Sequence, residues 1–324
     1  MAARTALRYS SRREESFDSF ADHVVAGLGD DPKWLSAKYF YDSTGSELFE
    51  EITRLPEYYL TRVERDLLVQ YTPPLMTSTG IRTMVELGAG SASKTRILLD
   101  GMVRAGAGGT YVPIDVSEAF LSETASALHA DYPGLRIVPV TADVSRDFQL
   151  PRHDGPVLFA LLGSTIGNFD EMHARQLLRR IRQLMEPADR FLLGADLHKD
   201  VGELTAAYND AAGVTARFNL NMLQVLNREL GADFDTSTFL HRAFYNEQLH
   251  RIEMHLVSSV DQVVTIPGMG RIALGQGETI RTEISCKYDR AGIDVLFSAA
   301  GMTLEEWHTD DLQRFALAVG RVAP

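Results

Sequence analysis

The stretch Met84-Val85-Glu86-Leu87-Gly88-Ala89-Gly90-Ser91 joins a short apolar run to two glycines. Thr83 to Leu87 has the length and composition of a buried strand, and a helical pattern follows from Ala92 to Arg104. Glycines in such a turn let the backbone approach a ligand closely, and the amides of the following helix point at the same spot. The stretch therefore predicts a strand, turn and helix that bind a nucleotide-like cofactor.

The residues around this turn indicate which cofactor fits. A dinucleotide fingerprint has a third glycine, but that position is Ser93 here. Glu86 stands two residues before Gly88, and a carboxylate there repels a pyrophosphate but suits a positively charged ligand. S-adenosylmethionine carries such charge on its sulfonium and ammonium groups. The turn therefore favours S-adenosylmethionine, although a glycine pair alone is more often a simple tight turn.

Two further acids follow the next two predicted strands. Asp115 ends the run from Tyr111, where a carboxylate can accept hydrogen bonds from both ribose hydroxyls. Asp143 follows the run from Ile137 to Thr141 and is placed to meet the adenine edge. Acids at three successive strand ends support the cofactor prediction more strongly than the glycines do.

Composition limits the remaining choices. The chain has 324 residues, 45% apolar and 23% charged, as expected for one large or two ordinary globular domains. A net charge of −12 without a basic cluster argues against a nucleic-acid partner. The single cysteine, Cys286, and nine scattered histidines lack metal-site spacing, so no metal is expected. We expect a small-molecule substrate and a cytoplasmic protein, because no secretory signal or membrane-spanning run is present in the sequence.

Strands and helices alternate from Thr83 to Asp196, which predicts a doubly wound parallel sheet. The expected strands are Thr83 to Leu87, Tyr111 to Asp115, Ile137 to Thr141, Val157 to Leu162 and Phe191 to Ala195. The expected helices between them are Ala92 to Arg104, Glu118 to Ala130 and Glu171 to Met185. Alternation returns with a helix over Ala291 to Ala300 and two strands, Thr303 to His308 and Gln313 to Val319.

Six or seven strands ending in a hairpin are typical of the α/β class I (Rossmann-like) S-adenosylmethionine methyltransferase fold. Between the two parts of this pattern, residues 200–230 read as helical and residues 239–287 as antiparallel strands. We expect a methyltransferase domain of residues 63–198 plus 288–324. Residues 8–62 plus 199–287 are expected to form a second, α+β domain that binds the substrate. Ligands of such sheets lie beyond the carboxyl ends of the strands, under this second domain.

Several sequence blocks, taken in order, resemble the histidine Nα-methyltransferases of ergothioneine biosynthesis from about residue 33 to the C-terminus. They are KYFYD (38–42), LPEYY (55–59), LGSTIGN (162–168), YNDAAGVT (208–215), NREL (227–230) and TEISCK (282–287). The resemblance implies three successive methyl transfers from S-adenosylmethionine to the α-amine of L-histidine. The product would be hercynine, Nα,Nα,Nα-trimethylhistidine. A monomer is expected.

The resemblance also assigns the substrate pocket, in which Glu283 and Ser285 hold the imidazole. They stand two residues apart, so on a strand both side chains face one side. A carboxylate and a hydroxyl can satisfy a neutral or a charged imidazole. Asn168 and Tyr208 are expected to hold the substrate carboxylate and amine, with Gly163 at the amine side. Two further expected contacts are Thr215, weaker and direct or through water, and Met254, as pocket lining.

Tyr58 is the residue expected to act in catalysis. It can orient the amine lone pair, whereas a phenol with an unshifted pKa of about 10 is a poor base at neutral pH. Proton transfer to solvent through water is equally open. Tyr58, Tyr41 and Phe49 add aromatic surface near the product's trimethylammonium, where cation–π contact is worth roughly 0.5 to 2 kcal/mol.

On the cofactor side, Lys94 is expected to reach the methionine carboxylate and to balance Glu86. Val144 stands where the family leads us to expect a phenylalanine, so the packing on adenine should differ. The complete set of expected cofactor contacts is Tyr41, Glu86, Gly88, Lys94, Asp115, Asp143 and Val144.

Three rival functions are weighed against this one. A nicotinamide oxidoreductase would need the missing third glycine. A non-catalytic S-adenosylmethionine-binding protein would be expected to lack Asn168 or the block around Tyr58, and both are present. An Nα-methyltransferase for another amino acid, such as tryptophan, is the nearest rival. Glu283 and Ser285 favour imidazole over indole, which has one donor and no acceptor.

Overall fold

The computed structural model describes residues 19–324 except 91–93, 107–108, 117, 145 and 147. Its largest element is an eight-stranded sheet in the order β13-β14-β7-β6-β2-β3-β4, with β5 also pairing with β3. Neighbouring strands run parallel except β14, which is antiparallel to β7 and β13. The strands are β2 (Thr83–Leu87), β3 (Thr110–Asp115), β4 (Arg136–Ile137), β5 (Val140–Thr141), β6 (Val157–Leu161), β7 (Arg190–Asp196), β13 (Met302–Thr309) and β14 (Phe315–Val322).

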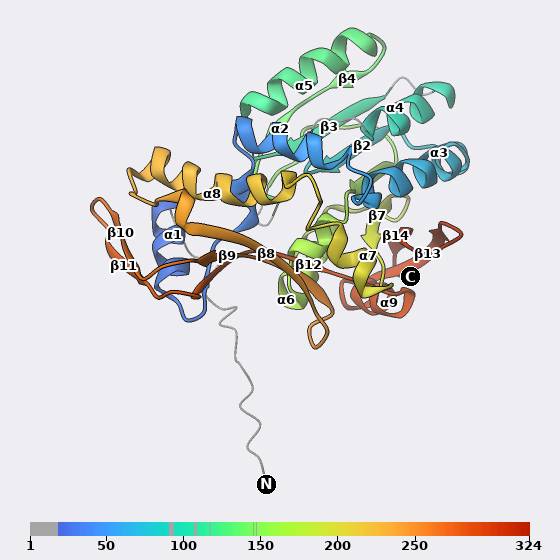
Figure 1. The fold of residues 1–324 in the computed structure, drawn as a ribbon. Coiled ribbons are helices and arrows are strands. Elements are labelled where there is room, and N and C mark those ends of the chain that lie inside the picture. Colours follow the sequence, from blue (N-terminus) through green and yellow to red (C-terminus); the bar gives the residue numbers. More distant parts are fainter. Residues whose placement is uncertain (1–18, 91–93, 107–108, 117, 145, 147) are drawn as a thin grey trace.

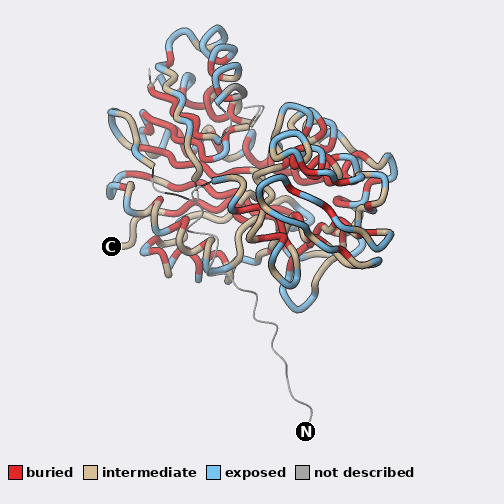
Figure 2. The backbone as a smooth tube through the Cα atoms, turned by 90° about the vertical axis from the view of Figure 1, so that its left-hand side faces the viewer, coloured by how far each residue is buried: buried red, intermediate tan, exposed pale blue. Residues whose placement is uncertain are grey.

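Helices pack on both faces of this sheet (Figure 1), which confirms the doubly wound arrangement. Alternate side chains of a strand point to opposite faces, so Met84 packs with one set of helices and Val85 with the other. Figure 2 shows the buried strands running through the centre of this layered part. The first set of helices is α3 (Tyr59–Thr79), α4 (Thr95–Arg104) and α5 (Glu118–Asp131), and the second is α6 (Glu171–Leu184) and α9 (Arg290–Ala299).

The expected third strand differs from the prediction. Instead of one strand over Ile137 to Thr141, the chain forms β4 and β5, each of two residues. Pro139 lies between them and has no N–H to donate to a sheet ladder. The interruption follows from that missing donor. The start of the helix expected at Ala92, and Ser93 with it, lie outside the described residues.

A second, four-stranded sheet has the order β1-β12-β9-β8, and β10 and β11 form a separate hairpin. The antiparallel pairings of β8 with β9, β9 with β12 and β10 with β11 agree with the expected antiparallel segment. α8 (Val214–Leu230) lies along this sheet (Figure 1) and packs on β8, β9 and α2. The remaining strands are β1 (Lys33–Trp34), β8 (Phe239–Asn246), β9 (Arg251–Ser258), β10 (Gln262–Ile266), β11 (Gly270–Leu274) and β12 (Thr279–Cys286).

The region expected to be helical over 200–230 is two helices, α7 (Val201–Ala206) and α8, with a break between them. Gly213 ends the break with a φ of 69°, a left-handed conformation that favours glycine. Asp210 accepts hydrogen bonds from the amides of Val214 and Thr215 and so closes the first turn of α8. Tyr208 lies in this break, and its hydroxyl forms a 2.8 Å hydrogen bond with Ser285 on β12.

The N-terminal elements lead into a long helix. They are α1 (Phe20–Gly29), the 3-10 helix η2 (Ala37–Phe40) and α2 (Ser43–Ile52). The helix that follows, α3, spans 21 residues and packs on α4 and β14. The expected domain boundary between residues 62 and 63 therefore falls inside a continuous helix, and the domain division stays a prediction. In the part of the chain that is described, no helix combines the length and the apolar character needed to cross a membrane.

Candidate active site

One large cavity, of about 1650 Å³, lies beyond the carboxyl ends of β2, β3 and β6 and reaches β12 of the second sheet. This is where ligands of open α/β sheets bind. Of the residues expected in the site, those that line this cavity are Tyr41, Tyr58, Glu86, Gly88, Lys94, Asp115, Asp143, Val144, Gly163, Asn168, Tyr208, Glu283 and Ser285.

The structure does not place Thr215 and Met254 on the cavity wall. Thr215 is in the first turn of α8 and 3% exposed, and its amide is bound to Asp210. Met254 is 1% exposed on β9, where it pairs with Glu283 across the sheet. Met254 therefore supports the strand that carries Glu283. The expected lining role of Met254 and the expected weaker, direct or water-mediated contact of Thr215 stay predictions.

The glycine turn lies at one end of the cavity. Gly88 and Gly90 have φ values of 72° and 52°, which favour glycine, and a Cβ on either would meet no protein atom within 4 Å. The turn is tied to β3, because the Gly90 amide donates to Asp115 Oδ2 at 3.2 Å and the Gly88 amide to the carbonyl of Ile114 at 2.8 Å. The turn and Asp115 thus form one backbone-lined surface, as a cofactor site requires.

Glu86 is buried beneath this turn, with 3% of its surface exposed. Its Oε2 accepts hydrogen bonds from Thr95 Oγ1 and the Tyr111 hydroxyl, both at 2.6 Å. Burial raises the pKa of Glu86 to about 7, although these two hydrogen bonds and Lys94 oppose the rise. A large part of its acceptor capacity is therefore used within the protein.

Lys94 has a different direct partner from the one expected. Its Nζ lies 2.5 Å from Oε2 of Glu64 on α3, while its charge also favours the ionised form of Glu86. Glu64 is fully buried, and its Oε1 accepts the Gly163 amide at 2.7 Å. Gly163 itself has a φ of 73°, and a Cβ there would come within 3.0 Å of Lys94 Nζ. Glu64 thus joins Lys94, expected to bind the cofactor, to Gly163, expected to lie beside the substrate amine.

The N-terminal segment closes the cavity near the third predicted acid. Lys38 Nζ lies 3.4 Å from Asp143 Oδ2, and both residues line the cavity. Val144 is half-buried and packs with the apolar cluster of α6 and α9. The expected adenine end is therefore bounded by two parts of the chain that are distant in sequence.

At the other end of the cavity, β12 presents Glu283 and Ser285 on one side. Tyr208 donates a hydrogen bond to Ser285 Oγ at 2.8 Å, and Lys287 Nζ donates to the same oxygen at 2.8 Å. Burial raises the pKa of Glu283 to about 7, against the opposing charge of Lys287. The expected imidazole pair and Tyr208 are thus brought together, with Lys287 as an unexpected fourth member.

Lys287 belongs to a buried ion network centred on Asp196 at the end of β7. Both side chains are fully buried, and Lys287 Nζ lies 2.8 Å from Asp196 Oδ2. Asp196 also binds Lys199 and accepts from the Tyr59 hydroxyl at 2.8 Å. Burial alone would raise the pKa of Asp196, but Lys287 and Lys199 outweigh it and lower that pKa.

The loop after β6 approaches β12 closely. A Cβ on Gly167 would lie 2.9 Å from the carbonyl of Cys286, so glycine is needed for this contact. Ser164, a non-glycine residue with a φ of 56°, accepts the Asp196 amide on its Oγ at 3.0 Å. The hydrogen bond with Asp196 supports this positive φ. Asn168, at the end of η3 (Thr165–Asn168), lies on the cavity wall.

Aromatic rings line the space between the two ends. The ring centroids of Tyr58 and Tyr208 lie 6.3 Å apart, those of Phe49 and Tyr58 6.2 Å, and those of Tyr41 and Phe49 5.7 Å. Burial is the first cause that raises the pKa of Tyr58 well above its ordinary value. Its phenol stays protonated at neutral pH, so it can orient a partner through hydrogen bonds but cannot take up a proton as a general base.

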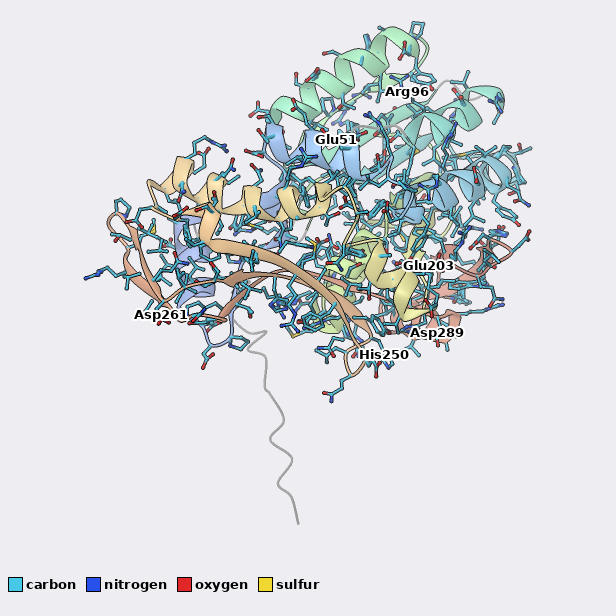
Figure 3. All side chains as sticks on the ribbon, in the orientation of Figure 1. Glu51, Arg96, Glu203, His250, Asp261 and Asp289 are labelled. Carbon is cyan, nitrogen blue, oxygen red and sulfur yellow. The ribbon has the colours of Figure 1, made fainter. Side chains whose placement is uncertain are left out.

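Four histidines also line the cavity: His23, His173, His198 and His250. His250 lies in the hairpin between β8 and β9 (Figure 3) and lines the cavity together with His198. Their ring centroids are 5.0 Å apart. Across the described residues, no group of three His, Cys, Asp or Glu side chains is arranged to hold a metal ion.

Most of this chain is similar in sequence to known proteins. The family described as "Histidine-specific methyltransferase, SAM-dependent" matches residues 20–322. A histidine N-alpha-methyltransferase from Mycolicibacterium smegmatis is 41% identical over 297 residues, 91% of this chain and 92% of that protein. An ergothioneine biosynthesis protein 1 from Neurospora crassa is 30% identical over 289 residues, 86% of this chain and 32% of that protein.

Among solved structures, an S-adenosylmethionine-dependent methyltransferase from Clostridium acetobutylicum aligns with a TM-score of 0.50. The alignment covers 86% of this chain and 99% of that one at 10% sequence identity. This likeness concerns the fold alone, and it confirms the expected class I methyltransferase architecture.

Proposed function

Because the chain belongs to the family of S-adenosylmethionine-dependent, histidine-specific methyltransferases, we propose that it trimethylates the α-amine of L-histidine. The product is hercynine, and the pathway is ergothioneine biosynthesis. The observation that carries the proposal is that Glu283 and Ser285, a pair suited to imidazole, line the same cavity as the glycine turn.

The donor end of the cavity supports S-adenosylmethionine. Gly88 and Gly90 leave the backbone open to a ligand, and Asp115 stands beside them for the ribose hydroxyls. Lys94 lines the cavity, where its charge can reach a carboxylate. When bound, S-adenosylmethionine supplies an activated methyl group on a sulfonium. These donors and acceptors suit its ribose, its charged tail and its carboxylate.

The acceptor end orients the substrate. Glu283 and Ser285 would fix the imidazole, while Asn168 and Tyr208 would hold the carboxylate and amine. Methyl transfer is an in-line displacement that needs a neutral amine about 3 Å from the methyl group, and such positioning can supply on the order of 7 to 11 kcal/mol. Positioning by these side chains is therefore the largest catalytic contribution of this chain.

Proton removal is the second requirement, because the amine is an ammonium at neutral pH and must lose a proton before each transfer. Tyr58 lines the cavity with a protonated phenol. Its oxygen can accept a hydrogen bond from the amine and aim the lone pair. The proton then leaves to solvent through water, since taking it on the phenol would require a buried phenolate.

The product's permanent cation fits the aromatic wall. Tyr41, Phe49, Tyr58 and Tyr208 all line the cavity. Contact of a trimethylammonium with such rings is worth roughly 0.5 to 2 kcal/mol. This surface can accept the growing cation at each step without a new negative charge.

The alternative substrate is another aromatic amino acid, with tryptophan the nearest case. An indole offers one donor and no acceptor, so it would leave either Glu283 or Ser285 without a partner. Incubation with S-adenosylmethionine and an equimolar mixture of the twenty amino acids, read by mass, tests the choice. The proposal expects histidine alone to gain three methyl groups, and preferential methylation of any other amino acid would reject it.

Further properties follow as proposals. Residues 63–198 plus 288–324 would hold the cofactor, and residues 8–62 plus 199–287 the substrate. We propose a cytoplasmic monomer that acts on a small molecule without a metal. The net charge of −12 disfavours nucleic acid as a partner.

A further inference from the structure

Lys287 contacts Ser285 and Tyr208, two of the residues proposed to bind the substrate. It follows β12 directly, so the alternation Glu283, Ser285, Lys287 puts the three side chains on one face of the strand. Its fully buried Nζ donates to Asp196 Oδ2 at 2.8 Å, to Ser285 Oγ at 2.8 Å and to the Tyr208 hydroxyl at 3.3 Å. An ammonium has three donors, and these contacts use all of them.

These contacts favour one hydrogen-bond direction at Ser285. A hydroxyl oxygen has two acceptor positions, and here Tyr208 and Lys287 each donate to it. The remaining hydrogen-bonding group of Ser285 is its hydroxyl proton, so Ser285 can only donate a hydrogen bond to a substrate. Glu283, when ionised, can only accept. The pocket thus offers one donor and one acceptor.

The charges of the Asp196 network also influence the pocket, because they affect whether Glu283 is ionised. Asp196 is a single carboxylate between two ammoniums, Lys199 and Lys287, so the network carries an excess positive charge next to Glu283. An ionised Glu283 compensates that excess, whereas a protonated one would leave a buried cation unbalanced. Lys287 is the cation that acts on Glu283.

We infer that Lys287 is a positioning residue for the substrate, which makes Ser285 a hydrogen-bond donor and favours the ionised form of Glu283. The pocket then selects the neutral imidazole in one tautomer, with its N–H toward Glu283 and its bare nitrogen toward Ser285. An imidazolium, which has two N–H donors, would face the Ser285 proton and is disfavoured. This inference rests on the proposed histidine substrate.

Other titratable groups around Glu283 do not replace this role. The phenols of Tyr41, Tyr58 and Tyr208 face it and stay protonated, because burial raises the pKa of each. On β9 the register partners of Glu283 and Ser285 are Met254 and Ile252, both apolar. The charged residues of β9 alternate with them and so lie on the other face of the sheet; they are Arg251, Glu253 and His255.

The first test measures binding of L-histidine, in the presence of S-adenosylhomocysteine, between pH 5.5 and 9. Lys287→Met should weaken binding at pH 7 at least about tenfold and move the pH at which affinity is half-maximal up by about one unit. Lys287→Arg should keep the parent midpoint. Lys199→Met is the matched comparison, because it removes one charge from the same Asp196 but no contact with Ser285, and it should move the midpoint less than Lys287→Met.

A parent-like midpoint in Lys287→Met, with or without a uniform loss of affinity, would overturn the inference, since a merely structural role predicts that result. Unchanged S-adenosylhomocysteine affinity shows that the variant is folded. If it does not fold, nitrogen NMR of ¹⁵N-labelled L-histidine bound to the parent decides. One protonated and one bare ring nitrogen are expected at pH 7, and two protonated nitrogens would refute the inference.

The same experiments separate this inference from the proposed function. A parent protein that neither binds nor methylates L-histidine rejects the function itself. If the parent methylates L-histidine and the pH midpoint of L-histidine affinity is the same in Lys287→Met and the parent, only the role of Lys287 is rejected.

Discussion

Lys94 Nζ lies 2.5 Å from Glu64 Oε2, an ion pair that joins α3 to the start of α4 at the cavity wall. The other oxygen of Glu64 accepts the amide of Gly163, which comes from the loop after β6. One buried carboxylate therefore fixes a residue expected to bind the cofactor and another expected to bind the substrate.

Glu64→Ala should lower the free energy of unfolding by about 1 to 3 kcal/mol, because it leaves the partly buried Gly163 amide without its acceptor. Glu64→Gln keeps an acceptor and should lose less. Lys38→Ala, which breaks the more exposed pair with Asp143, is the control and should cost no more than about 1 kcal/mol. Urea unfolding checks the order, and equal losses for Glu64→Ala and Lys38→Ala would contradict it.

Glu283→Ala should lower kcat/KM for L-histidine by roughly 5- to 150-fold, which corresponds to about 1 to 3 kcal/mol for a lost buried acceptor. The KM for S-adenosylmethionine should stay unchanged, because Glu283 lies at the acceptor end. Steady-state kinetics with each substrate varied in turn measures both. If Glu283→Ala methylates histidine as well as the parent, the assignment of the imidazole pocket is wrong.

Tyr58→Phe should slow methylation by roughly 2- to 12-fold, the loss expected for one hydrogen bond of about 0.5 to 1.5 kcal/mol. The aromatic face remains, so the product should still be trimethylated. Rates of formation of mono-, di- and trimethylhistidine, followed by mass, give the effect at each step. Unchanged rates at all three steps would remove Tyr58 from the mechanism.

Glu86 makes stability depend on pH in a defined direction. Its pKa rises from 4.5 to about 7 on folding, so between these values the folded protein binds a proton that the unfolded chain has lost. The contribution of Glu86 to stability therefore falls as pH rises through this window. Glu86→Gln, which cannot ionise, should gain up to about 3 kcal/mol over the parent at pH 8 and little at pH 4.5.

Urea unfolding of the parent and Glu86→Gln at several pH values isolates this one group, because other titrations occur in both proteins. Gln keeps an oxygen that can accept from Thr95 and Tyr111. A stability difference that does not change with pH would show that Glu86 has the same pKa in both states.

The sheet could be predicted from sequence because its strands are short apolar runs that end at glycines or acids. The run from Thr83 to Leu87 is fully buried, as its composition indicates. Pro139 is present in the sequence, and its missing N–H accounts for the division of the strand expected over Ile137 to Thr141 into β4 and β5. The local sequence thus predicts most strands of this sheet.

The buried charges could not be predicted in the same way. Glu64 sits in a helix with many polar neighbours, where an acid normally faces water, and its burial depends on Gly163 about a hundred residues away. Lys287 meets Asp196 only after β7 and β12 are brought together. Sequence blocks identified the residues at the cavity surface, whereas the groups that hold them in place depend on tertiary contacts.

The most direct measurement of the central claim is NMR of the product formed from L-histidine and S-adenosylmethionine carrying a ¹³C-labelled methyl group. The account predicts one methyl signal from three equivalent groups on the α-nitrogen, with the imidazole unmodified. A labelled methyl on a ring nitrogen, or no labelled histidine at all, would contradict it.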